Sequence, residues 1–329
     1  MGRGSIQKQA AAVFYASGLY QKGQSRHDAK EQAQAEAREE LGRGLTSKEL
    51  SERIGIYGSK TFSDYIDRAQ DFARFAEDKF GIASPFELRA EHAAEFLLQK
   101  MQDGCLQSTL AAYGAALRKF DIALERSAEV MRDGRLFDAK QEDRIRSGVD
   151  EAAQIFNEYA ERGDRHSRAY QEPEAVIGAI SQDDHRLAAA IQVESGARLT
   201  GVQELPRHFL HGIVEHPVTG EEVGSFHCRG KGSFDYEAYV SLETYSNLDE
   251  YVQEHGALRI DPDAYREDVK QACEAVGEDY SGTHAFRHNF VQEMYGRAIE
   301  IYQDDHKAAK AVMELVGHHR TSVLQVYLR

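Results

Sequence analysis

Two short stretches near the C-terminus decide the fold: HAFRH at 284–288 and ELVGHHRTSVLQVY at 314–327. On a helix, residues 284, 287 and 288 share one face, so two imidazoles and a guanidinium project together. Thr283, just before them, is a candidate cap for such a helix. A cationic face of this kind is costly unless it meets an anion. The first stretch therefore predicts an anion-binding helix.

In the second stretch, nine residues separate His318 from Tyr327. Along one straight helix they would turn by about 900° and lie on opposite sides. Gly317 can end one helix, and Thr321 or Ser322 can cap the next. The sequence thus predicts a break that allows His318 and Tyr327 to meet.

Two further signatures precede these stretches. Arg198 follows a Gly-Ala break in ESGARLTG (194–201), and Lys231 lies in RGKG (229–232), at the tip of an expected hairpin. Either one alone is typical of an ordinary surface residue. The occurrence of all four signatures, in this order, carries the functional interpretation.

Together these segments resemble the motifs of the tyrosine recombinases, the phage integrase family. The resemblance covers roughly 170–329, and the helical region before it fits the family's core-binding domain in size and helicity. It implies a mainly α fold with a small antiparallel β-sheet in the C-terminal domain, and two domains forming a C-shaped clamp on DNA. The resemblance also implies a catalytic set, which consists of Arg198, Lys231, His284, Arg287, His318 and Tyr327.

The implied reaction is site-specific recombination of DNA. Tyr327 attacks the phosphate to form a 3′-phosphotyrosyl link, and a different strand's 5′-hydroxyl reverses the step. Arg198 and Arg287 clamp the phosphate with His318 as a third donor, because guanidinium forks donate paired hydrogen bonds to anions. We expect His284 to accept the phenol proton and Lys231 to protonate the leaving 5′-oxygen. Neither ATP nor a metal or other cofactor is required.

The sequence departs from the family pattern in two places. Gly201 stands three residues after Arg198, where family members commonly carry an acidic residue, and Glu204 is a possible substitute. Two residues follow Tyr327, so exchange of a C-terminal tail between protomers is not assumed. His288 and His319 are expected to support or pack against the site.

Three regions are expected along the chain. Residues 1–45 predict a helical extension divided by Gly18 and Gly23, and 46–165 predict a compact helical DNA-binding domain of four or five helices, opened by a capping box at Thr46. A polar linker over 161–170 leads to the catalytic domain, 166–329. There we expect a helical region around 174–205 with Pro173 at its start, an antiparallel sheet within 211–242, and four helices, at 245–255, 263–276, 284–303 and 306–316.

The charge balance is unfavourable for DNA binding. The net charge is −15, and the formal charges are 7 − 5 = +2 for 1–45, 18 − 23 = −5 for 46–165 and 15 − 27 = −12 for 166–329. Either the carboxylates face away from DNA, or the protein works in concentrated salt, where the Debye length falls to about 3 Å. Both explanations stay open.

The remaining composition favours a globular protein of the cytoplasm, and the resemblance implies association with the nucleoid. Apolar residues make up 41%, and neither a long apolar run nor a signal-like N-terminus is evident. Cys105, Cys228 and Cys273 are widely spaced and are expected to be reduced structural thiols.

Three alternative functions share parts of this pattern. His284 and His288 have the spacing of helical zinc ligands, with His318 and His319 as candidates to complete a set, but no Glu follows the first His. A type IB topoisomerase shares the chemistry, although its members usually lack a His at position 284. A non-catalytic DNA-binding relative is the third alternative. The expected partner is double-stranded DNA. Two copies of the chain are expected to bind one DNA site and four copies to bind two sites, with accessory DNA-bending proteins; a membrane is not expected.

Overall fold

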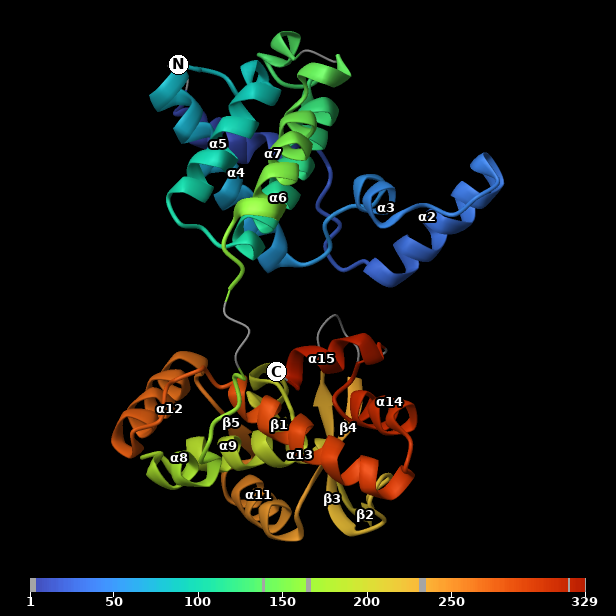
Figure 1. Ribbon diagram of the computed structural model, residues 1–329, viewed down its shortest axis with the longest axis vertical. Helices are drawn as coiled ribbons and strands as arrows, with labels where there is room; N and C mark the ends of the chain where they lie inside the picture. The colour runs from blue at the N-terminus through green and yellow to red at the C-terminus, as the bar shows by residue number, and fades with distance from the viewer. Residues whose placement is uncertain (1–3, 138–139, 164–166, 231–234, 319, 329) are drawn as a thin grey trace. The chain divides into compact units, whose positions relative to one another are not determined.

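A computed structural model describes residues 4–137, 140–163, 167–230, 235–318 and 320–328. The chain divides into two compact units, Met1–Asp164 and Arg165–Arg329, which are coloured blue to green and green to red in Figure 1. The division falls inside the stretch expected to be a polar linker.

Among its described residues, unit 1 contains helices, their connecting loops and one isolated β-bridge, between Tyr20 and Ile56. Its α-helices are α1 (Ile6–Ala16), α2 (Arg26–Leu41), α3 (Ser47–Arg53), α4 (Ser59–Phe80), α5 (Ala90–Gln102), α6 (Gln107–Ser127) and α7 (Ile145–Tyr159), with short 3-10 turns η1 (Pro85–Glu87), η2 (Gly134–Leu136) and η3 (Gln141–Asp143). Helix α4 contributes aromatic side chains to the core, since Phe62 and Phe72 are buried. Thr46 forms the expected capping box with Glu49 at the start of α3.

The first 45 residues do not form a separate extension. Ile6, Val13 and Phe14 of α1 are buried in the same apolar core as α4 and α6, and the Phe14 ring stacks on Phe120 at 5.5 Å. Only α2 and α3 project from the helices α4–α7 (Figure 1). The expected boundary at 45/46 therefore divides one core, because the apolar face of α1 is short and its partners are distant in sequence.

Unit 2 combines helices with two small sheets. Its helices are α8 (Pro173–Ala179), α9 (Asp183–Ser195), α10 (Leu199–Val202), η4 (Arg207–Phe209), α11 (Leu242–His255), α12 (Pro262–Val276), α13 (Ala285–Tyr302), α14 (Asp305–Leu315), η5 (Thr321–Val323) and α15 (Leu324–Tyr327), and its strands are β1 (Glu204–Pro206), β2 (Leu210–Glu215), β3 (Glu222–Arg229), β4 (Asp235–Val240) and β5 (Ala257–Arg259). The expected fold class, mainly α with a small antiparallel sheet in the C-terminal domain, is confirmed.

The three-stranded sheet has the antiparallel order β2-β3-β4, with Cys228 on β3 opposite Tyr236 on β4. The sequence anticipated an antiparallel sheet over 211–242, although residues 231–234 of the expected hairpin tip lie outside the described residues. It did not anticipate the pairing of β1 with β5, which lie more than fifty residues apart and are three residues each. The expected helical region 174–205 is in fact α8, α9, α10 and the start of β1, since Gly196 ends α9 in the left-handed conformation (φ 65°).

Candidate active site

Three segments of unit 2 meet around one buried guanidinium. Arg287, on α13, is fully buried and donates to the carbonyl oxygens of Gly196 (2.6 Å) and Val316 (2.5 Å), and its Nε donates to the Tyr327 hydroxyl (3.0 Å). These contacts join the end of α9, the end of α14 and the C-terminal α15. Arg287 therefore forms hydrogen bonds to the segments that carry two of the other sequence signatures.

Glycine allows these segments to approach closely. A Cβ atom at Gly196 would lie 2.5 Å from the Phe290 ring, and one at Gly317 would lie 2.7 Å from the Tyr236 ring. Gly317 also adopts φ 66°, the left-handed conformation that ends α14. The break expected between His318 and Tyr327 is thus present.

Tyr327 lies inside this network and is only 3% exposed. Its hydroxyl is 3.2 Å from Nε2 of His318, and the same nitrogen is 3.0 Å from Nη2 of Arg198. Because a guanidinium only donates, this geometry requires Nε2 to be an unprotonated acceptor. The Tyr327 hydroxyl can then accept from Arg287 and donate to His318.

The positive charge of the site has no acidic partner. Among the residues that the structure describes, no carboxylate forms an ion pair with Arg198 or Arg287; all three acceptors of Arg287 are neutral. Burial, and then the charge of Arg287, lower the pKa of Arg198. Two neighbouring guanidiniums without a counter-ion form a site suited to a doubly coordinated anion.

His284 and His288 lie beside Tyr327, with ring centres 6.1 and 4.8 Å from that of the tyrosine. Burial lowers the pKa of each imidazole to about 4, and the nearby arginines contribute to both shifts. Both rings are therefore neutral at pH 7. The sequence suggested His284 as the acceptor of the Tyr327 proton. In the described part of the chain, however, no hydrogen bond joins His284 to the Tyr327 hydroxyl, and the nearest acceptor is His318.

Several local expectations are wrong. Thr283 does not cap α13; His284 occupies the cap position and no side chain closes it. Thr321 and Ser322 lie within η5, whose cap position is Arg320. Glu204 does not support Arg198, because it belongs to β1 and lies 3.5 Å from Arg259, an exposed residue on β5. Lys231 and His319 lie outside the described residues.

Sequence reasoning missed two residues of the site. Gln292, on α13, donates from Nε2 to the backbone oxygen of Tyr327 at 2.7 Å and so fastens α15. Cys228 occupies the space beside Gly201, where a Cβ atom would lie 2.4 Å from its sulfur. The i, i+4 relation of His288 to Gln292 was a usable signal for the first. The second contact links distant segments and leaves no local pattern.

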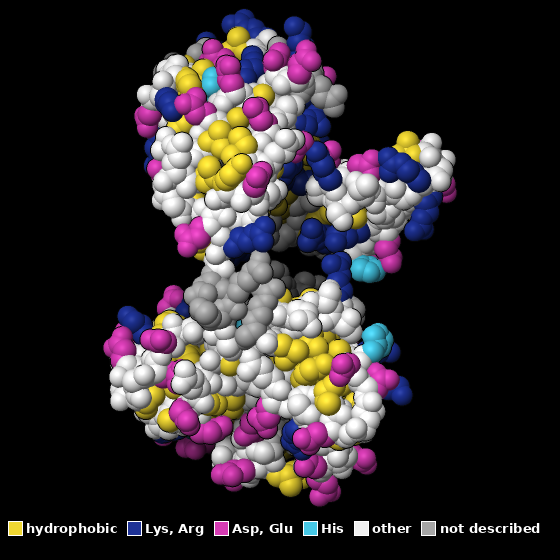
Figure 2. All heavy atoms as spheres, in the orientation of Figure 1, with side chains coloured by type: hydrophobic (Ala, Val, Ile, Leu, Met, Phe, Trp, Pro, Cys, Tyr) yellow, Lys and Arg dark blue, Asp and Glu magenta, His cyan; other side chains and the backbone are white. Residues whose placement is uncertain are grey.

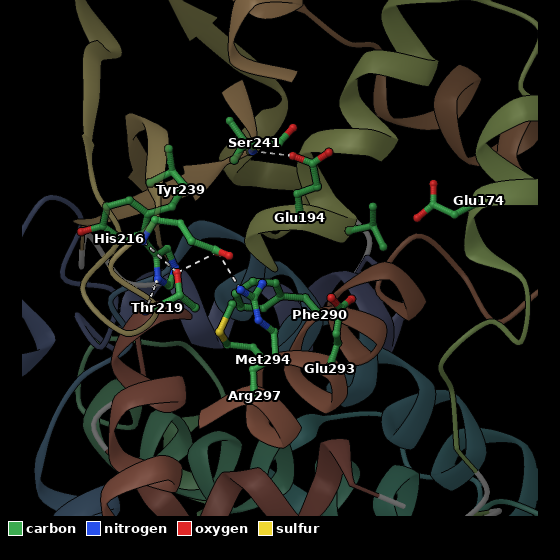
Figure 3. Close-up of a pocket in the computed structure, with 14 residues that line it drawn as sticks. Glu174, Glu194, His216, Thr219, Tyr239, Ser241, Phe290, Glu293, Met294 and Arg297 are labelled. Atoms are coloured by element: carbon green, nitrogen blue, oxygen red, sulfur yellow. Dashed lines mark hydrogen bonds and ion pairs between the residues drawn. The ribbon is translucent and has the colours of Figure 1, made fainter. Parts of the chain in front are cut away.

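Two other features bear on function. In the described residues, no group of three or more His, Cys, Asp or Glu side chains is arranged to hold a metal ion. A pocket of about 270 Å³ opens between α9, β4 and α13, where Glu194 accepts from Ser241 and Glu221 pairs with Arg297 (Figure 3). None of the expected site residues lines this pocket, so it is separate from the guanidinium pair.

On the face of unit 2 that Figure 2 shows, many exposed carboxylates gather at one end. Carboxylates gather over the end of the unit formed by α11 and the β2–β3 turn (Figure 2), where Glu221, Glu222, Glu243 and Glu250 are exposed. Within this unit α15 lies at the other end (Figure 1). On this face, the gathered carboxylates therefore lie away from the helix that carries Tyr327. No helix of the described chain has both the length and the apolar character needed to cross a bilayer.

Comparison with known proteins gives no match to a family model and no match to a curated protein sequence. Solved structures do match. The XerH site-specific recombinase bound to its palindromic difH substrate, in a post-cleavage complex, has a TM-score of 0.59 at 16% identity, over 98% of this chain and 92% of that one. The XerH pre-cleavage complex has a TM-score of 0.55 with the same identity and coverage. The chain therefore has the fold of the tyrosine recombinases.

Proposed function

We propose that this protein is a site-specific DNA recombinase, an integrase-type DNA strand transferase. The observation that carries the proposal is the Tyr327 hydroxyl held between Arg287 and His318, beside a guanidinium pair with no described carboxylate partner. A backbone phosphate has the charge and the oxygen geometry that such a pair accepts. The XerH structures, solved on DNA before and after cleavage, have the same fold.

In the proposed reaction, the Tyr327 oxygen attacks the phosphorus and the bond to the 5′-oxygen breaks, leaving a 3′-phosphotyrosyl ester and a free 5′-hydroxyl. Arg198 and Arg287 stabilise the charge that develops on the non-bridging oxygens. The phenol proton passes to an imidazole, with His318 the nearest in the free protein and His284 adjacent. Lys231 supplies the proton to the leaving oxygen, and attack by a second strand's 5′-hydroxyl reverses the step.

This chemistry conserves the phosphoester bond energy, so the proposal requires no ATP, metal or cofactor. The proposed partner is double-stranded DNA, bound by a clamp of both units. Two copies of the chain would bind one DNA site and four copies would bind two sites, assisted by DNA-bending proteins. We propose that this activity takes place on the nucleoid in the cytoplasm. Its proposed role is the integration or excision of a mobile element.

The proposal is tested with a nicked suicide substrate, which traps the covalent protein–DNA adduct. Tyr327→Phe should form no adduct yet retain DNA affinity and folding, because the ring still packs while the nucleophilic oxygen is gone. Tyr295→Phe, in which a partly buried tyrosine on α13 changes in the same way, should behave as the parent protein. Adduct formation by Tyr327→Phe would assign the nucleophile elsewhere, and its absence in the parent protein would favour a non-catalytic DNA-binding relative. Plasmid relaxation without strand exchange would favour a topoisomerase.

A further inference from the structure

Strand β4 carries, at its second residue, a tyrosine whose buried hydroxyl forms no hydrogen bond with good geometry among the described residues. In unit 2, the buried side-chain polar atoms without a hydrogen-bond partner among the described residues are the Tyr236 hydroxyl and Nδ1 of His288. Both lie beside the guanidinium–phenol network. A phenylalanine would fill the same space without the cost of desolvating a hydroxyl. Packing alone therefore does not account for the buried oxygen of Tyr236.

Tyr236 is fixed in place from two sides. Its ring packs against Gly317, so closely that a Cβ atom there would lie 2.7 Å from it, and Gly317 directly precedes His318. Across the sheet it is paired with Cys228, whose sulfur fills the space beside Gly201. Tyr236 therefore touches the segments that carry His318 and Arg198.

The hydroxyl also lies within the electrostatic reach of both guanidiniums. Burial and the neighbouring Cys228 raise the pKa of Tyr236, while the charge of Arg287 and the proximity of its guanidinium to the hydroxyl act in the opposite direction; the hydroxyl in turn acts on Arg198. Arg287 has five N–H donors, and three of them are used by Gly196, Val316 and Tyr327. Two remain, which is enough for one bond to a phosphate oxygen and one to a neighbouring acceptor.

We propose that Tyr236 is a positioning residue: in the DNA-bound protein its hydroxyl accepts a hydrogen bond from Arg287 and fixes that guanidinium against the phosphate. A neutral acceptor has an advantage over a carboxylate here, because it orients the guanidinium without neutralising the charge that the phosphate needs. The inference rests on the proposed recombinase function. It gives Arg287 a supporting partner that is itself neutral.

Tyr236→Phe tests the inference by removing one oxygen. We expect single-turnover adduct formation on the suicide substrate to slow about tenfold, as expected for a loosened transition-state contact. DNA affinity should stay within about twofold, and the thermal midpoint should be unchanged or higher, since a buried unpartnered hydroxyl is removed. The matched control is Tyr239→Phe, a tyrosine of the same strand whose side chain lines the separate pocket (Figure 3); it should cleave at the parent rate.

A second substrate distinguishes positioning from a general structural role. With a methylphosphonate at the scissile position, the phosphate charge is removed, so an effect transmitted through Arg287 should shrink to about twofold or less. Equal slowing on both substrates, or a lowered thermal midpoint, would make the role merely structural and overturn the inference. An unchanged rate would also overturn it. These results are distinct from absence of adduct in the parent protein, which would remove the proposed function itself.

Discussion

Position 201 requires the absence of a side chain. The sulfur of Cys228 occupies the space that a Cβ atom of residue 201 would enter, at 2.4 Å. A side chain there, acidic or not, would collide with the β3 strand. The departure from the family pattern noted in the sequence thus has a steric cause, and Arg198 is left without a carboxylate at that point.

We therefore expect Gly201→Ala to lower the free energy of unfolding by about 1–3 kcal/mol, the usual cost of overpacking a filled core. Gly178→Ala is the control, since nothing lies within 4 Å of that position on α8 and its φ is not positive; it should be neutral or stabilising by about 0.5–1 kcal/mol. Urea unfolding measures both. Equal stability of the position-201 variant and the parent protein would contradict the packing argument.

His288 should make the protein sensitive to acid. It is 2% exposed, and burial lowers its pKa to about 4, below the value near 6.5 of an unfolded chain. As the pH falls, the unfolded state takes up this proton first. Protonation of His288 therefore has no effect on the free energy of unfolding above about pH 6.5, and it lowers that free energy by about 3 kcal/mol as the pH falls to 4.

His288→Gln should remove this part of the pH dependence, measured as the slope of the unfolding free energy between pH 6.5 and 4. His27→Gln, at a side chain that is 77% exposed, should leave the slope unchanged. An identical slope in the parent protein and the His288 variant would show that His288 does not resist protonation in the folded state.

At the scale of elements, α13 organises the site. Arg287, His288 and Gln292 all project from it toward Tyr327, while Phe290 and Met294 pack on the other segments of the core. α15 contains only four residues, too few to form a stable helix on its own. Its position therefore depends on contacts to α13.

Gln292→Leu should loosen α15 by removing the bond to the Tyr327 backbone oxygen. One hydrogen bond contributes about 0.5–1.5 kcal/mol, so hydrogen exchange of residues 321–328 should accelerate about 2- to 12-fold, with slower adduct formation. Gln253→Leu is the control, because Gln253 bonds only to Asp249 one turn earlier on the exposed face of α11. Unchanged exchange would mean that other contacts suffice to hold α15.

At the scale of the molecule, the two units have separate cores. One apolar cluster draws its residues from 6–160, and the two others draw theirs from 170–328. The stability of unit 2 should therefore not depend on burial contributed by unit 1.

We expect residues 165–329, produced alone, to unfold cooperatively in urea and to retain the network around Arg287. Adduct formation should fall at least tenfold at limiting protein concentration, because the DNA contacts proposed for unit 1 are lost, and it should recover as the fragment concentration is raised. The full chain is the reference. A fragment without a cooperative transition would show that unit 2 needs unit 1 to fold.

Local chemistry in the sequence was enough to predict most elements. The shared face of residues 284, 287 and 288 indicated α13, Thr46 and Pro173 marked helix starts, and Gly317 marked the break after α14. These features act within a few residues, so they can be recognised without knowledge of the fold. The conjunction of short motifs likewise indicated Arg198, Arg287, His318 and Tyr327, which the structure brings into one network.

The tertiary structure decided what depends on distant neighbours. The burial of α1 in the core of unit 1, the pairing of β1 with β5, and the contact of Gly201 with Cys228 each join segments that share no local pattern. The same holds for the nearest acceptor of the Tyr327 proton, since distances between side chains on separate segments follow from packing alone. Sequence determined which groups are present, and packing determined which of them touch.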